Sequence, residues 1–532
     1  MSKRDEKLFK SYQQGQVNLF PPSLASLIPE GHPVRTINKV IDQLDIGPIL
    51  LKYKGGGASS YHPRMMLKIL VYGYVRNTYS SRKIEQAVKE HVHFMWLAGG
   101  NQPDHHSINR FRSERLKGVL QTVFSQVVLM LHEAGHLNIK DVYTDGTKIE
   151  ANANRYTFVW GRAVKTNRKR IAKQLEELWS YAERVAKEEL MDTEPCNFES
   201  LDPEAVADTI AAIDDALKAS PEAGKKQKQK AGYGRKNWPG KLKQYEEDEK
   251  RLDGRNSYSK TDHDATFMRL KDDHMQNGQL KAAYNLGLST NNQFIIHYSL
   301  HPNPTDTLTL KPHLEGYHNY YGCYPTQCTA DAGYGSEENY AYLEQTQTEA
   351  FVKYNYFHQE QQRSTLKKKP FHPNNLSYNP EQDLFICPMG QHMHKVGTKT
   401  RKTASGYPQQ LTLYQAQNCK GCPLRGACHK AEGNRIIEVN HRLRAYRQLA
   451  RKKLNSEQGI RKRKRRCTEV EAVFGILKQN HGFKRFSLRG KLKVEIETGL
   501  HALAHNFRKL AAKTAQLATF SSSNPALAFQ RA

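Results

Sequence analysis

Apolar positions along the chain recur at two different spacings, which predict a protein of mixed helices and strands. From residue 19 to about residue 137 the spacing is helical. A helix is predicted to begin at Pro63, because an apolar stripe follows it at Met66, Leu67, Leu70 and Tyr74. Another is predicted to begin at Asp104, with an outward face formed by Arg110, Arg112 and Arg115. Basic helices of this kind suit a helix-turn-helix type of DNA contact, although any helical bundle of a basic protein has a similar pattern.

Beyond residue 137, strand and helix patterns alternate, which is typical of an α/β fold. Short apolar runs predict strands at Ile139–Asp145, Lys281–Leu288, Phe294–Leu300, Gln327–Asp331 and Ala350–Asn355. Helical spacing predicts helices at Thr307–Tyr320, at Glu337–Gln345 and from about Cys467 onward. Thr290-Asn291-Asn292 has the composition of a hairpin turn.

Two segments interrupt this α/β core. In the first, apolar stripes at 171–185 and 206–217 predict an antiparallel helical hairpin, followed by a Lys/Gln/Gly-rich stretch, Gly224–Gly240, that we expect to be a mobile linker. The second segment, about 358–435, is polar, rich in Pro and contains Cys, and we expect a small inserted module there.

These patterns predict seven consecutive regions. They are an N-terminal helical DNA-binding domain (1–137), the first core strand (138–155), a helical insertion with its linker (156–257), the continued catalytic core (258–357), a Cys-rich, zinc-ribbon-like insertion (358–440), a basic segment with the final core helices (441–515) and a flexible tail (516–532).

The charge balance points to a polyanionic partner. Lys and Arg number 81 against 53 Asp and Glu, a formal net charge of +28. Double-stranded DNA is the first candidate, because neutralised phosphates release condensed counterions. An anionic membrane surface is the alternative, but the sequence has no basic amphipathic helix or lipid-anchor motif to favour it. With no signal-peptide pattern and no apolar run of about 18 residues, we expect a cytoplasmic protein.

Three acids stand at comparable places in the predicted core. Asp145 ends the first strand, Asp331 ends the fourth, and Glu471 lies early in the last helix. Phosphodiester cleavage needs an activated oxygen nucleophile and a stabilised leaving oxygen, which two Mg²⁺ ions held by carboxylates supply. Alone, each Asp is better explained as a cap or turn residue, and Glu471 as a solvated helix residue. Their combination in a basic α/β chain favours a metal-dependent nuclease site.

Lys478 lies seven residues after Glu471, close to two helical turns, so both side chains share a face. A metal-binding acid beside a phosphate-binding amine suits a nuclease helix. A solvated charge pair explains the same spacing.

Several segments resemble DDE transposases of insertion sequences, and the insertion-sequence 1182 family in particular. The first-acid segment is Asp145-Gly146-Thr147-Lys148-Ile149-Glu150-Ala151-Asn152-Ala153-Asn154, and Ala330-Asp331-Ala332-Gly333-Tyr334 resembles the second. The third-acid segment is Val470-Glu471-Ala472-Val473-Phe474-Gly475 with Lys478, then Arg485-Phe486 and Arg489-Gly490. Ser259-Lys260-Thr261-Asp262-His263-Asp264-Ala265 and Tyr284-Asn285 resemble that family's segment before the hairpin.

The resemblance implies an RNase H-like core, dependence on Mg²⁺ or Mn²⁺, and binding to terminal inverted repeats. It implies that Asp145, Asp331 and Glu471 are the catalytic acids and that Lys478 contacts the DNA end. The implied reaction is hydrolysis at the element's end to free a 3′-hydroxyl, which then attacks target DNA. A homodimer or higher multimer on DNA and a bacterial, nucleoid-associated location follow from the same resemblance.

One feature departs from the family pattern. Related transposases often carry Tyr and Arg at set spacings before the final Glu, yet position four before Glu471 is Cys467, with Arg465 and Arg466 just upstream. We therefore assign neither arginine a catalytic role from sequence.

Four cysteines crowd into the predicted insertion, in the array Cys387, Cys419, Cys422 and Cys428. The C-x₂-C knuckle and four potential thiolates predict a structural zinc site, with His392, His394 and His429 as possible substitutes for one ligand. Four reduced thiols in a small module are the alternative.

Six consecutive basic residues, 461–466, directly precede the acid-bearing helix. A charge run is usually a solvated face, but its position beside the predicted cleft favours phosphate contact. The predicted DNA-binding residues are Lys478, Arg461, Arg463, Arg465, Arg466, Arg485 and Arg489.

The sequence thus favours an active DNA transposase. The alternative from another class is a domesticated, catalytically silent DNA-binding protein derived from one. A different RNase H-like nuclease, such as a resolvase, is a third possibility.

Overall fold

The computed structural model describes residues 23–53, 59–190, 194–270, 278–361 and 370–523, with side chains through Thr514. The chain divides into two compact units, one formed by residues 1–119 with 503–532 and the other by residues 120–502. The predicted helical stretch from residue 19 therefore begins outside the described residues. The backbone of 516–523, predicted to be tail, continues the last helix, and 524–532 lie outside the described residues.

The first unit is helical. Its helices are α1 (Pro33–Gln43), α2 (Gly47–Leu50), α3 (Pro63–Val75), α4 (Ser81–Glu90), α5 (Val92–Leu97), α6 (His105–Arg110) and the C-terminal part of α19 (Lys491–Ser523). Both predicted helix starts are confirmed, because Pro63 is the first residue of α3 and Asp104 caps α6 by accepting the Ser107 amide at 2.9 Å. The outward position predicted for Arg112 is wrong. A π-helical turn, Phe111–Arg115, follows α6, and Arg112 is buried with its guanidinium donating to Tyr79 and Ser81.

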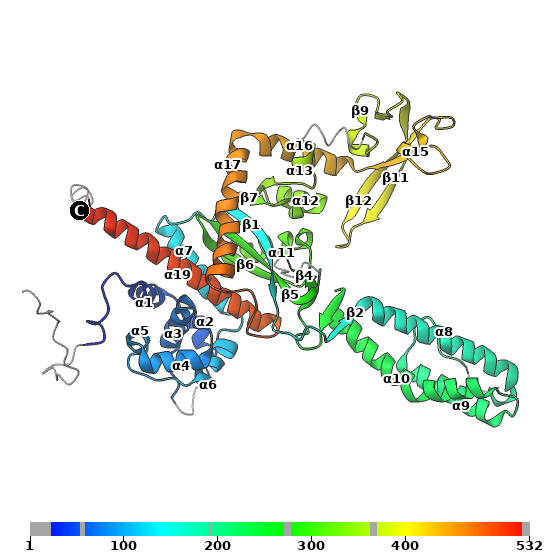
Figure 1. Ribbon diagram of the computed structural model, residues 1–532, viewed down its shortest axis with the longest axis horizontal. Helices are drawn as coiled ribbons and strands as arrows, with labels where there is room; N and C mark the ends of the chain where they lie inside the picture. Colours follow the sequence, from blue (N-terminus) through cyan, green and yellow to red (C-terminus); the bar gives the residue numbers. More distant parts are fainter. Residues whose placement is uncertain (1–22, 54–58, 191–193, 271–277, 362–369, 524–532) are drawn as a thin grey trace, which may run out of the picture. The chain divides into compact units, whose positions relative to one another are not determined.

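A mixed six-stranded sheet forms the centre of the second unit (Figure 1). Its strands are β1 (Asp141–Glu150), β4 (Thr266–Arg269), β5 (Leu280–Asn291), β6 (Phe294–His301), β7 (Gln327–Ala330) and β8 (Glu349–Val352). The order is β4-β5-β1-β7-β8, and β6 pairs with β5. β1 is antiparallel to β5 but parallel to β7, which is parallel to β8. The predicted mixed α/β fold is confirmed.

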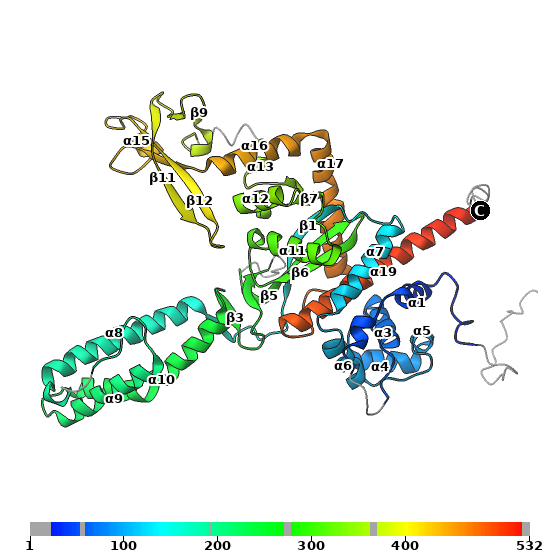
Figure 2. The ribbon, with the colours of Figure 1, turned by 180° about the vertical axis from the view of Figure 1, so that it is seen from behind.

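Helices pack against this sheet. They are α7 (Leu120–Glu133), α11 (Leu310–Tyr321), α12 (Glu337–Gln345), α16 (His441–Asn455) and α17 (Glu457–Arg466). The helical segment continues beyond α17 through a π turn, Cys467–Glu471, into α18 (Ala472–Gly475). α17 contacts β7 and β8, and α11 contacts β6. The helix predicted to begin near Cys467 is part of a longer helical segment that begins at Glu457. Figure 2 shows α16 and α17 meeting at a corner.

The predicted helical insertion contains three long helices rather than a hairpin and a linker. Two short strands, β2 (Phe158–Trp160) and β3 (Ser257–Ser259), pair at its base. α8 (Gly161–Val185), α9 (Pro203–Ala219) and α10 (Lys225–Leu252) lie side by side. They share a core, to which α10 contributes Ala231, Trp238 and Leu242.

The linker predicted at Gly224–Gly240 is wrong, because most of it is the first half of α10. Its buried residues recur three to four positions apart, and tertiary burial outweighs the poor helix propensity of its glycines. Gly234 has a packing role, since a Cβ there would lie 3.0 Å from the Trp238 ring and 3.1 Å from Ile210. The segment composition suggested flexibility, but these contacts fix a helix.

The Cys-rich module is a five-stranded antiparallel sheet. Its strands are β9 (Ser377–Asn379), β10 (Leu384–Ile386), β11 (His392–Lys402), β12 (Pro408–Ala416) and β13 (Ile436–Val439), ordered β13-β12-β11-β10-β9. The short helix α13 (Phe357–Glu360) precedes this sheet in sequence, and α15 (Arg425–Cys428) lies between β12 and β13. Phe385, Met393 and Tyr414 form its small core.

Candidate active site

The pairing of β1 with β7 brings two of the predicted acids together. Their parallel register ends with Thr144 opposite Ala330, so Asp145 and Asp331 are the next residues on adjacent strands. β1 continues to Glu150 along β5, whereas the chain leaves β7 at Asp331 and enters a 3₁₀ turn, Ala332–Tyr334. Asp145 therefore lies within a strand and is 14% exposed, while Asp331 lies at a strand end and is 47% exposed.

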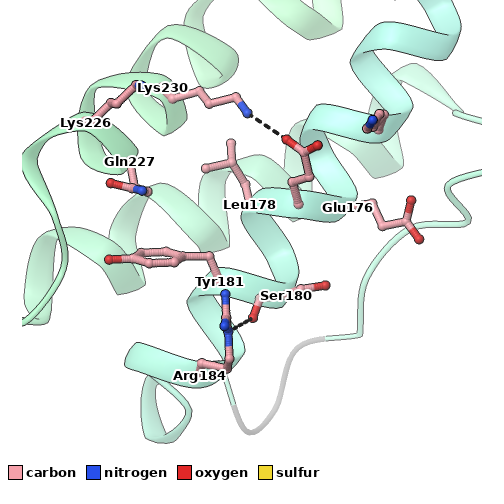
Figure 3. A pocket seen from close by; sticks show the side chains of 10 residues that line it. Glu176, Leu178, Ser180, Tyr181, Arg184, Lys226, Gln227 and Lys230 are labelled. Atoms are coloured by element: carbon pink, nitrogen blue, oxygen red, sulfur yellow. Dashed lines mark hydrogen bonds and ion pairs between the residues drawn. The ribbon is translucent and has the colours of Figure 1, made fainter.

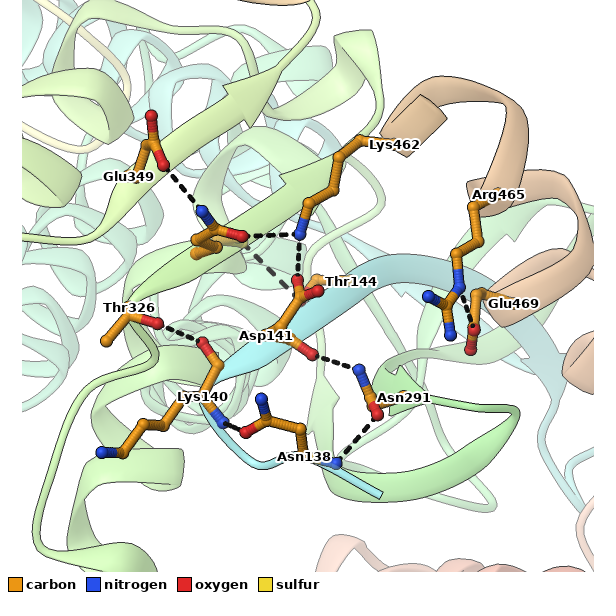
Figure 4. A network of polar contacts seen from close by, with 12 residues as sticks. Asn138, Lys140, Asp141, Thr144, Asn291, Thr326, Glu349, Lys462, Arg465 and Glu469 are labelled. Carbon is orange, nitrogen blue, oxygen red and sulfur yellow. Dashed lines mark hydrogen bonds and ion pairs between the residues drawn. The ribbon is translucent and has the colours of Figure 1, made fainter. Parts of the chain in front are cut away.

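Polar contacts on both sides of Arg466 fix α17 against the sheet (Figure 4). The buried Lys462 ammonium lies 2.5 Å from Asp141 Oδ1 and donates to Gln327 Oε1 at 2.7 Å. After Arg466, the buried Glu469 carboxylate accepts a hydrogen bond from the backbone N–H of Gln293 at 2.7 Å. These contacts join the helix to the start of β1 and to the β5–β6 turn, and so set the direction in which Arg466 points.

The Arg466 guanidinium lies among all three predicted acids. Its Nη2 is 2.7 Å from Asp145 Oδ2 and 3.7 Å from Asp331 Oδ2, and its Nη1 is 2.6 Å from Glu471 Oε1. The Arg466 side chain is 5% exposed and Glu471 is 46% exposed. Acids that are 140 or more residues apart in sequence therefore converge on one group.

A π-helical turn, Cys467–Glu471, explains why the sequence spacing did not identify Arg466. A π turn holds one residue more than an α turn, so residues five apart come onto one face. Arg466 is five positions before Glu471, and the two side chains form an ion pair in the structure. The π turn that begins at Cys467 thus places Arg466 on the same face as Glu471, beside the other two acids.

The electrostatics of the site centre on Asp145. Burial is the main cause that raises the pKa of the Asp145 carboxyl to about 6, and Arg466 and the Gly146 amide oppose this rise by favouring the ionised form. The carboxylates of Asp331 and Asp306 add to the rise. Although burial disfavours the charged guanidinium, the surrounding acids raise the pKa of Arg466. The arginine is thus the counter-ion of the acids.

Asp306, which the sequence did not single out, is a fourth acid beside Asp145. It begins a short 3₁₀ helix after β6 and accepts a hydrogen bond from Asn285 Nδ2 at 2.8 Å. A Cβ added to Gly146 would lie 2.8 Å from Asp306 Oδ1 and 3.0 Å from Asn285 Oδ1, so glycine after Asp145 allows this close approach. The Asn285 Oδ1 atom is buried and has no hydrogen-bond partner among the described residues. The signal available in the sequence was an acid directly before a predicted helix, Thr307–Tyr320.

The predicted DNA-binding residues have varied surroundings. Lys478 is half-buried in a π-helical turn, Ile476–Asn480. Arg461 is exposed and pairs with Glu457, and Arg463 lies over the Phe357 ring. Arg465 pairs with the buried Glu469. Two other guanidiniums donate to backbone carbonyls just beyond β1, Arg485 to Ala151 and Ala153 and Arg489 to Asn152. DNA contact by these residues stays a prediction.

Neither predicted metal site is assembled in the described part of the chain, where no three His, Cys, Asp or Glu side chains are arranged to hold an ion. At the acids, Arg466 lies between the carboxylates. In the Cys-rich module, Arg435 donates to Cys428 Sγ at 2.9 Å and its amide donates to Cys419 Sγ at 3.4 Å. All eight cysteines are free thiols. Zinc binding by this module stays a prediction from cysteine spacing.

Two family models match the chain. Residues 22–114 match a model described as Transposase domain (DUF772), and residues 386–511 match one described as Transposase DDE domain. These matches support a DDE transposase. The DDE match contains Glu471 and most of the Cys-rich module, whereas Asp145 and Asp331 lie outside it. No curated protein and no solved structure matches the chain.

The two matched segments agree with the prediction from sequence that the chain is a transposase of an insertion sequence. The matches do not single out the insertion-sequence 1182 family. None of the described helices is both long and apolar enough to cross a bilayer.

Proposed function

We propose that this DDE transposase is of the insertion-sequence 1182 type, binding the terminal inverted repeats of its element and cleaving and transferring DNA strands. The observation that carries the proposal is the convergence of Asp145, Asp331 and Glu471 on one guanidinium. A catalytically silent, domesticated DNA-binding protein is not favoured, because such a protein has no need to keep three distant acids in one place.

We further propose that the central sheet is an RNase H-like core. In support, β1, β5 and β6 form an antiparallel meander while β7 and β8 continue parallel to β1. Two acids then lie on the adjacent parallel strands and the third on a helix that packs against them. Function on this architecture depends on the side chains rather than on the fold alone.

The chemistry of the three acids suits a divalent metal ion, although in this structure the Arg466 guanidinium lies between their carboxylates. Carboxylates are hard oxygen ligands of the kind that Mg²⁺ and Mn²⁺ prefer, and Asp145, Asp331 and Glu471 would hold the ions. When bound, such ions activate an attacking oxygen and stabilise the leaving oxygen. Arg466 keeps the three acids close by offsetting their mutual repulsion.

The proposed reaction has two phosphoryl transfers. Water first attacks the phosphodiester at the element's end, which breaks the P–O bond and leaves a 3′-hydroxyl. That hydroxyl then attacks a target phosphodiester in line and displaces a new 3′-oxygen. Lys478 would contact the DNA end and position it for both steps. Double-stranded DNA is the proposed partner, with the chain acting as a homodimer or higher multimer in the bacterial cytoplasm, associated with the nucleoid.

Cleavage of an end-bearing DNA duplex with Mg²⁺ tests the proposal. Asp331→Asn keeps the side-chain shape but removes the charge, and we expect strand cleavage to fall by roughly a hundredfold or more. A matched control is Asp208→Asn, which changes an exposed acid of α9 and should cleave as the wild type does. A Mn²⁺ titration followed by electron paramagnetic resonance should show fewer bound ions for Asp331→Asn alone. Equal cleavage by both variants would reject the assigned acid.

A further inference from the structure

Two cavities away from the acids carry several basic side chains, and they differ in how those charges are balanced. The first lies between α8 and α10 (Figure 3). There Lys230 lies 3.3 Å from Glu177 Oε2, and Arg184 donates to the Ser180 carbonyl. One of its cations is thus paired with a carboxylate, and another has a backbone acceptor within the insertion.

The second cavity, which we call the arginine pocket, lies between α16 and the Cys-rich module and has a volume of about 420 Å³. Arg401 enters from β11, while Arg444, Arg447 and Arg451 come from α16. The three helix residues are three and four positions apart and share one face. Their spacing along α16 corresponds to about 10 Å.

Within the described part of the chain, the four arginines of this pocket form no ion pair. Among the side chains that the structure describes, no carboxylate lies within 4.0 Å of any of their guanidiniums. The two acids that line the pocket have other partners, because Glu360 accepts the Tyr354 hydroxyl at 2.7 Å and Glu438 lies 3.6 Å from Lys399. The Arg447 Nε atom is buried without a hydrogen-bond acceptor. The pocket therefore has unbalanced positive charge and an unused donor.

Aromatic rings hold two of the guanidiniums in place. The Arg444 guanidinium lies 5.1 Å from the centre of the Tyr378 ring and 5.2 Å from that of Phe385, and Arg447 lies 5.8 Å from Tyr354. Tyr354 and Phe385 are almost fully buried, at 1% and 0% exposed. Since the arginines cover these faces, they are not available to stack on a base. The pocket thus offers fixed hydrogen-bond donors but no stacking platform.

We propose that the arginine pocket binds backbone phosphates of a DNA strand outside the catalytic centre. The planar guanidinium fork matches phosphate oxygens, and contacts of this type position DNA without reading its sequence. α16 is joined to α17 through Ser456, which ends one helix and caps the next, so the pocket and Arg466 lie on consecutive helices. This inference rests on the proposed function, because it takes DNA as the partner.

The test measures binding without cleavage. Fluorescence anisotropy follows a labelled duplex of unrelated sequence, with a chelator present and salt varied, for wild type and for Arg444→Gln with Arg447→Gln. We expect the double variant to raise Kd about 10- to 100-fold and to lower the slope of log Kd against log salt by about 1 to 2. The matched control is Arg442→Gln, on the same helix, whose guanidinium donates to Tyr407 and Tyr446 instead. It should bind within about twofold of wild type.

Arg451→Gln tests the pocket even if the double variant does not fold. Because Arg451 is exposed, its replacement should lower the slope of log Kd against log salt by about 1 without unfolding the chain. Wild-type affinity and slope in both the double variant and Arg451→Gln would overturn the proposal. A melting temperature that rises as far with inorganic phosphate as with the duplex would assign the pocket to a free anion and also overturn it. Asp331→Asn should bind the duplex with wild-type affinity. A wrong assignment of the pocket would therefore appear in the binding assay, and a wrong assignment of the acids in the cleavage assay.

Discussion

α16 and α17 are consecutive helices with similar basic compositions, yet their cations are used in different ways. On α17, Lys462, Arg465 and Arg466 each face a carboxylate, and Lys462 and Arg466 are buried. On α16, Arg444 and Arg447 of the pocket lie against aromatic rings, and neither forms an ion pair with a described side chain. The density of positive charge along a sequence therefore does not reveal which cations are available to DNA.

The difference has a physical origin. A buried cation must be compensated inside the protein, because removing it from water costs several kcal/mol. Acids of the sheet compensate the buried cations of α17, Lys462 and Arg466, and the same contacts fix the helical segment that carries Glu471. The half-exposed guanidiniums of α16 are still solvated and can exchange water for phosphate. α17 thus organises the proposed catalytic site, whereas α16 carries the arginines that we propose bind a DNA strand.

Among the changes that test this difference between the helices, removal of Arg466 should lower the free energy of unfolding most. Arg466→Ala leaves Asp145 buried beside Asp331 and Glu471 without a counter-ion, and we expect the free energy of unfolding to fall by about 3 kcal/mol in metal-free buffer. Urea denaturation measures the change. Arg461→Ala is the control, since its guanidinium is 70% exposed and pairs with Glu457 one turn away. Equal stability of both variants would show that the acids do not depend on Arg466.

Charge removal at Asp145 should have a somewhat smaller effect that depends on pH. The Asp145 pKa is about 6 in the folded protein against the ordinary 3.8, so the protonated form is favoured by folding. That stability is present below about pH 4 and is lost as the pH rises through 6. Asp145→Asn does not titrate, and its unfolding free energy relative to wild type should therefore rise by about 2–3 kcal/mol over this window.

Urea denaturation in metal-free buffer at several pH values measures this effect. The double variant of the arginine pocket is the contrast, because guanidiniums stay charged throughout and its difference from wild type should not vary over the same range. A flat pH profile for Asp145→Asn would mean that Asp145 ionises in the folded protein as readily as in the unfolded chain.

Local pattern was enough to predict the core elements. The bounds predicted for the helix Glu337–Gln345 are those of α12, and the strands around Asp145 and Asp331 are present in β1 and β7. At Gly224–Gly240 the prediction failed because composition was given more weight than a sparse apolar stripe. A better weighting would have found α10 from Ala231, Trp238 and Leu242.

The rest of the site could not be predicted from local pattern. Arg466 is brought to Glu471 by a π turn, and the sequence gives no sign of whether a helix will form such a turn. Asp306 reaches Asp145 across the β5–β6 hairpin, with glycine at position 146 making room. Both depend on tertiary packing, so periodicity and spacing carry no information about them.

The smallest effect concerns the corner between the two basic helices. A Cβ at Gly459 would lie 2.7 Å from the Leu454 Cα and still nearer the Lys453 carbonyl, so glycine lets α17 turn closely against the end of α16. Gly459→Ala should lower the unfolding free energy by about 1–3 kcal/mol, because backbone must move to make room. It should also weaken both cleavage and duplex binding, since Arg466 and the arginine pocket lie on either side of that corner.

Gly475→Ala is the matched control for this corner. Gly475 ends α18, and a Cβ there would meet nothing within 4 Å, so alanine should be neutral or stabilise by up to about 1 kcal/mol through its better helix propensity. Thermal melting and the two DNA assays compare the variants. If Gly459→Ala lost cleavage but kept duplex affinity, the corner would serve the acids alone. The two helices would then act independently, because the angle between α16 and α17 would position Arg466 without affecting how the arginines of α16 bind DNA.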